Sequence, residues 1–141
     1  MDSFALYEFQ RLLTDTWQNQ GWNIPREVTY YTSELLAEHV EKPDWEPKPS
    51  YAEVYLQMRS TNTAKQLGDA CFFARAVFPE YKQRRGISSD YFVQIGQGSY
   101  DLVLRNVDHP AIKILRDHFE FCAEAVWTAV HAHGKFRSMW D

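Results

Sequence analysis

The sequence predicts an all-α protein, a single-domain bundle of about six helices. Apolar residues recur three and four positions apart along nearly the whole chain, which is the spacing of one helix face. No segment pairs as a strand with another. The 141 residues suffice for one sizeable core and are too few for two, so residues 1–141 are expected to form one domain. Residues 64–78 are apolar on almost every side, which places this helix at the centre.

The first two helices are predicted from their apolar faces and their ends. Between residues 5 and 17 the apolar side chains fall on one face, and Gly21 ends the helix because glycine tolerates a left-handed cap. Pro25 begins the second helix, since proline is tolerated in a first turn. Its apolar side carries Val28, Tyr31, Thr32, Leu35, Leu36 and His39.

A proline-rich connector separates the second helix from the third. Residues 42–49 contain three prolines, which break helices and favour an extended chain. Ser50 followed by Glu53 is a capping-box pattern, so a short helix is expected from Tyr51. A second such pattern, Thr63 to Gln66, is expected to open the central helix, and Pro79 marks its end.

Two longer helices complete the bundle, at residues 89–105 and 109–133. In the first, Gly96 and Ser99 share the apolar face, and small residues there favour close packing of another helix, whereas Gly98 is expected on the opposite face. Pro110 opens the second, which is expected to run without interruption to Gly134. Residues 135–141 form a tail.

Charge and cysteine content limit the classes of partner and location. The net charge of −4 argues against nucleic-acid binding, which would depend on Lys82, Arg84 and Arg85 with Arg75 and Tyr81 nearby. The two cysteines, at 71 and 122, fit reduced, buried thiols. The absence of a long apolar run predicts no membrane span, and an N-terminus without a basic, apolar leader predicts a cytoplasmic protein.

Histidine and tyrosine residues form the main candidate for a ligand site. His39 and His118 both project from the apolar sides of their helices, and His118 with Cys122 has the spacing of a shared metal or haem ligand pair. No recognised metal-binding motif accompanies them, so no metal, cofactor or catalytic residue is predicted. The alternative function is a small-molecule, metal or haem pocket, lined by His39, His118, Tyr31, Tyr91, Tyr100 and Gly96.

Tryptophans outside the apolar faces support a different function, protein interaction. Trp127 falls on the side of the last helix that carries Lys113 and Arg116, Trp45 lies in the connector and Trp140 in the tail. Either the chain folds back over these rings or a partner covers them. The prediction is a non-enzymatic interaction module, a homodimer or a small adaptor or regulator. In the dimer, helix 109–133 would place its two basic residues against the acids between Glu34 and Glu53.

One part of the sequence resembles a known family. The strings Leu67-Gly68-Asp69-Ala70-Cys71-Phe72-Phe73, Val77-Phe78-Pro79-Glu80, Ser89 to Gly96 and Ser99-Tyr100 resemble a family of small bacterial proteins of unknown function. The resemblance covers about a quarter of the chain. It implies a helical hairpin and a bacterial cytosolic setting, and it implies no activity.

Overall fold

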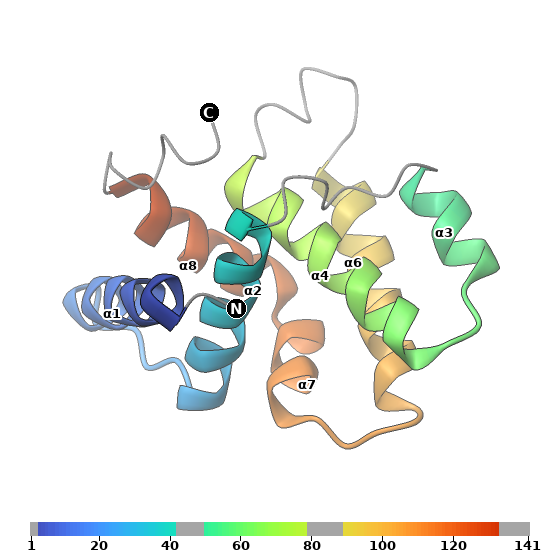
Figure 1. The fold of residues 1–141 in the computed structure, drawn as a ribbon, viewed down its shortest axis with the longest axis horizontal. Helices are drawn as coiled ribbons and strands as arrows, with labels where there is room; N and C mark the ends of the chain where they lie inside the picture. The colour runs from blue at the N-terminus through green and yellow to red at the C-terminus, as the bar shows by residue number, and fades with distance from the viewer. Residues whose placement is uncertain (1–2, 42–49, 79–88, 133–141) are drawn as a thin grey trace.

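The computed structural model describes residues 3–41, 50–78 and 89–132, and within these ranges it contains seven helices and no strand (Figure 1). The helices are α1 (Ser3–Asn19), α2 (Arg26–Glu41), α3 (Tyr51–Gln57), α4 (Thr61–Val77), α6 (Ser89–Leu104), α7 (Pro110–Asp117) and α8 (Phe119–Ala132). The predicted all-α class is therefore confirmed. The connector 42–49, the tail 135–141, their tryptophans and the basic residues 82–85 lie outside the described residues.

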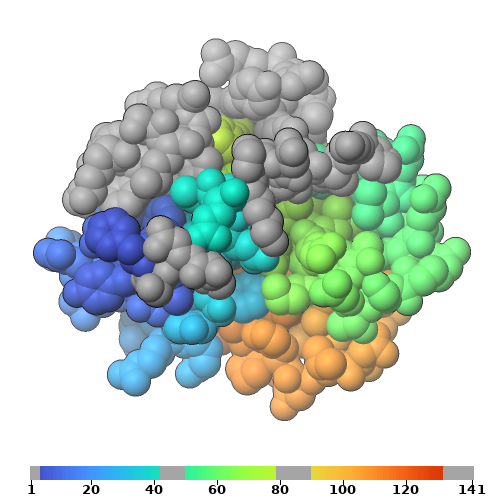
Figure 2. All heavy atoms as spheres, viewed as in Figure 1, coloured from blue at the N-terminus to red at the C-terminus, as the bar shows by residue number. Residues whose placement is uncertain are grey.

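Helix α4 lies at the centre, as predicted. Eleven of its 17 residues are buried, and it packs most extensively against α6 and also against α8, α3 and α2 (Figure 1). On the face shown in Figure 2, α2 lies between α1 and α4. Burial of apolar surface on all sides of α4 gives the bundle one continuous core, which contains Phe72, Phe73 and Phe92.

The connection between α1 and α2 depends on Gly21. This residue has a φ of +74°, and the N–H groups of Gly21 and Trp22 donate to the carbonyl oxygens of Gln18 and Trp17. This is the C-terminal glycine motif that the sequence predicts. A second contact ties α1 to the last helix, because the Trp17 indole Nε1 donates to the Ala125 carbonyl oxygen at 2.9 Å.

Serine side chains begin α3 and α4. Ser50 Oγ accepts from the Glu53 N–H at 3.1 Å, which confirms the predicted start of α3. Ser60 Oγ accepts from the Thr63 N–H at the same distance. Helix α4 therefore begins at Thr61 and not, as predicted, after a cap at Thr63, because Ser60 is the residue with extended backbone and the capping oxygen.

The predicted last helix, 109–133, is two helices, and this prediction was wrong. His118 leaves the helical conformation, with φ −128° and ψ 42°, and separates α7 from α8. Both pieces contact α6, but α7 also packs against α2, whereas α8 packs mainly against α4 and α1. The break leaves His118 exposed, not in the buried stripe where the sequence placed it.

No helix in the described ranges is long and apolar enough to cross a membrane.

Candidate functional site

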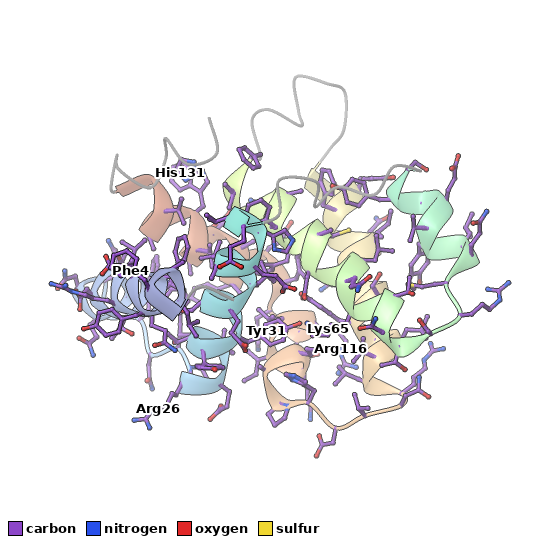
Figure 3. The ribbon with its side chains drawn as sticks, in the orientation of Figure 1. Phe4, Arg26, Tyr31, Lys65, Arg116 and His131 are labelled. Atoms are coloured by element: carbon purple, nitrogen blue, oxygen red, sulfur yellow. The ribbon has the colours of Figure 1, made fainter. Side chains whose placement is uncertain are left out.

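A buried carboxylate occupies the middle of the helix bundle. Asp69 of α4 is only 5% exposed. Its Oδ1 accepts hydrogen bonds from the hydroxyls of Tyr31 and Tyr100, each at 2.7 Å, and its Oδ2 pairs with Lys65 Nζ at 3.0 Å. In Figure 3 the side chains of Tyr31, from α2, and Lys65, from α4, lie next to each other. Three donors therefore compensate the cost of burying this charge.

Burial keeps the two phenols of this cluster neutral. Desolvation raises the pKa of Tyr31 and of Tyr100 well above the ordinary value, and the negative charge of Asp69 raises each further. Lys65 Nζ also lies 5.1 Å from the centre of the Tyr31 ring. Both phenols thus remain hydrogen-bond donors to a higher pH than an exposed tyrosine would. Through Asp69 they join α2, α4 and α6.

The Asp69 cluster also explains why glycine precedes Asp69 in the sequence. A Cβ atom added to Gly68 would lie 2.5 Å from the Tyr100 ring, so only glycine admits the ring at this distance. The Leu67-Gly68-Asp69 and Ser99-Tyr100 strings therefore meet in space. Asp69 was not among the predicted functional residues. The available signal was a lone acid within an otherwise apolar helix.

The structure brings together only two of the six predicted ligand-pocket residues, Tyr31 and Tyr100, and it joins them through Asp69. Tyr91 accepts a hydrogen bond from the Ala52 N–H at 3.0 Å, and the Phe119 ring covers Gly96.

The two histidines lie apart from these tyrosines. The His39 ring stacks on Phe73 with ring centres 4.5 Å apart. His118 lines a shallow surface hollow that contains none of the other five predicted residues.

Neither cysteine is arranged for chemistry. Both thiols are buried, and burial raises the pKa of Cys122 to about 11 and that of Cys71 further. His118 is exposed while Cys122 is buried, so the predicted pair does not share one environment. Within the described ranges no group of three or more histidine, cysteine, aspartate or glutamate side chains is placed to hold a metal ion.

The outer side of α8 exposes two aromatic rings. Trp127 is 38% exposed and stacks on His131 of the next turn, with ring centres 4.7 Å apart and planes at 22°. Phe121 is 50% exposed and makes an edge contact with Trp22 at 5.8 Å. Two contacts within the chain thus orient these rings and still leave much of each ring open.

One surface hollow lies beside α6 and another lies at its C-terminal end. The acidic hollow, of about 400 Å³, is lined by Asp90, Val93, Gln94, Gln97, Asp117, His118, Phe119, Glu120 and Phe121. The basic hollow, of about 440 Å³, is lined by Leu104, Arg105, Asn106, Val107, Asp108, Lys113 and Arg116. They differ in the sign of their lining charges.

The predicted interface residues Lys113 and Arg116 both line the basic hollow. Arg116 pairs through Nη1 with Asp101 and through Nε with Asp117, each at 3.0 Å, and its hydrogen bond with Asp117 is the main cause of its raised pKa. Because the chain breaks at His118, these residues do not share one helix face with Trp127, as the sequence analysis expected.

Arg75, named above as a possible nucleic-acid contact, lies mostly buried against Glu124 at 3.3 Å.

The comparisons with known proteins found no match to a family model, a curated protein or a solved structure.

Proposed function

We propose that the protein is a non-enzymatic interaction module that acts as a homodimer. The observation that carries this proposal is Trp127, a large ring that is exposed on the outer side of α8 and stacked on His131. Tryptophan is enriched among the few residues that dominate the affinity of protein interfaces. Its indole also has an N–H donor that suits contact with a polar neighbour.

The stacking on His131 strengthens this argument. Association costs conformational entropy for each side chain that must be ordered, and a ring already held against its neighbour loses less. Phe121 adds a second exposed ring near the start of the same helix, held by Trp22. Each of these two exposed rings on α8 is already oriented by a neighbouring ring, so a partner can cover either one with little rearrangement.

A substitution at Trp127 tests the proposal. If Trp127 is a central interface residue, Trp127→Ala weakens the dimer by about 2 kcal/mol, which is roughly a thirtyfold rise in Kd. Sedimentation equilibrium measures this change, and circular dichroism checks that the helices remain. The matched control is Leu56→Ala, since Leu56 is 74% exposed on α3, away from α8.

Equal dissociation constants for wild type and Trp127→Ala would contradict the assigned role of Trp127. A wild-type protein that stays monomeric at high micromolar concentration would contradict the homodimer itself.

A further inference from the structure

We infer that the homodimer forms through the strip that α6 makes with α7 and the start of α8, paired antiparallel with the same strip of a second copy. This inference rests on the proposed function and adds the surface and its mode of pairing.

One side of α6 lines the acidic hollow and leads to the basic one, which lies at the C-terminal end of this helix. Asp90, Gln94, Gln97 and Asp101 fall at spacings of three and four, which is a single helical stripe, and Arg105 follows one residue after the helix ends. Since α6 has 16 residues, this stripe is about 24 Å long. The hollows adjoin, because the Gln97 Nε2 of the acidic hollow donates to the Arg116 carbonyl oxygen of the basic one at 2.8 Å.

The charges of the hollows are opposite. The acidic hollow has three carboxylates in its lining and no lysine or arginine, whereas the basic hollow has three cations and one carboxylate. Asp101 partly neutralises Arg105 and Arg116, and Asp117 of the acidic hollow pairs with Arg116 of the basic one. Lys113, Asp90 and Glu120 form no ion pair within the part of the chain that the structure describes, so these three charges remain available to a partner.

A two-fold axis between two copies pairs each hollow with a hollow of opposite charge. In a symmetric pair the same surface serves both copies, so the acidic hollow of each copy meets the basic hollow of the other, twice per dimer. Each hollow also exposes one apolar side chain, Phe121 at 50% in the acidic one and Val107 at 45% in the basic one. In the antiparallel pair, Phe121 of each copy faces the basic hollow of the other copy, and Val107 faces the acidic hollow. Both side chains then lose contact with water.

The strip continues toward Trp127. Glu120 and Trp127 are seven residues apart on α8, which puts them on one side of that helix two turns apart. The Trp127 ring therefore lies two turns beyond the acidic hollow, on the side of α8 that carries Glu120.

Complementary charge reversals test the pairing. Lys113→Glu and Glu120→Lys each place like charges against one another twice in a homodimer, so each variant alone should dimerise at least tenfold more weakly than wild type. Mixed in equal amounts, the two variants restore both opposite-charge contacts, and the mixed dimer should return to within about threefold of the wild-type Kd. Arg26→Glu, the same reversal at an exposed position of α2, is the matched control.

The outcomes separate this inference from the proposed function. A monomeric wild type overturns both. A wild-type dimer that responds to Trp127→Ala but not to either reversal overturns the strip and keeps the homodimer. Reversals that weaken the dimer without rescue in the mixture overturn the antiparallel pairing. A mixture that grows beyond two copies by light scattering overturns the two-fold arrangement, and circular dichroism confirms that each variant is folded.

Discussion

At the residue scale, the most constrained side chain is Asp69. A buried carboxylate is costly unless it is paired and hydrogen-bonded, and here two phenols and one ammonium group supply the partners. Tyr31 lies on α2, Tyr100 on α6, and Lys65 on α4 one turn before Asp69. The carboxylate therefore fixes how α2, α4 and α6 meet. The cluster lies inside the fold and stabilises the scaffold that presents the strip.

Removing the carboxylate should destabilise the protein strongly. Asp69→Ala leaves two buried hydroxyls without their acceptor and a lysine without its partner, at a cost of about 3 kcal/mol in the free energy of unfolding. Asp69→Asn keeps an acceptor oxygen for the phenols and should cost less than half as much. Urea denaturation measures both changes. An alanine variant as stable as wild type would show that the cluster contributes no net stability.

The two phenols also predict how stability depends on pH. Tyrosine has a pKa near 10 in an unfolded chain, and burial raises the folded values of Tyr31 and Tyr100 above that. The unfolded chain therefore loses these protons first as pH rises. Their stabilisation is complete below pH 10 and decreases above it.

Comparison with Tyr31→Phe isolates the contribution of one phenol. The difference in unfolding free energy between wild type and Tyr31→Phe should shrink as pH is raised from 9 to 11.5, because only wild type can lose this proton on unfolding. Urea denaturation at each pH gives the difference. A constant difference over this range would contradict the raised pKa of Tyr31.

At the element scale, glycines set how closely the helices approach α6. A Cβ atom at Gly96 would lie 2.5 Å from the Phe119 ring and 3.2 Å from the Cys71 Cβ, which confirms that small size at this position serves helix packing. Gly98 lies on the other face of α6, as expected, but that face is covered. A Cβ atom there would meet the Tyr55 ring of α3, because α3 covers that side of α6.

Substitutions at the two glycines should therefore differ. Gly96→Leu forces the buried Phe119 ring out of place and should lower the free energy of unfolding by about 1–3 kcal/mol. Gly98→Ala displaces only the end of the half-buried Tyr55 side chain and gains up to about 1 kcal/mol of helix propensity, so it should be close to neutral. Thermal denaturation compares them. A Gly96→Leu protein with a midpoint at or above wild type would contradict the close packing.

The same elements show what local sequence can predict. Apolar spacing and the caps at Ser50, Gly21 and Pro110 depend on residues within one or two turns, and the structure confirms them. The break at His118 coincides with a change of packing neighbours from α2 to α4 and α1, which are distant in sequence, and the local sequence around it reads as one continuous helix. Asp69 meets tyrosines 38 and 31 residues away, a pairing that periodicity within one helix does not reveal.

At the scale of the whole molecule, the folded chain presents two kinds of surface. Inside the bundle, the buried Asp69 pairs with its polar neighbours and the phenylalanines pack in the core. The strip along α6 and the outer side of α8 carry exposed charges and partly exposed aromatic rings. In the proposed homodimer, a second copy of the chain would cover both.

The mass of the wild-type protein in solution tests this account most directly. Multi-angle light scattering across the micromolar range should give a mass that rises with concentration to twice 16.6 kDa. Higher salt should shift this rise to higher concentration, because screening weakens the attraction between the exposed charges of the strip. A constant mass of 16.6 kDa up to high micromolar concentration would contradict the homodimer and with it the pairing of the strips.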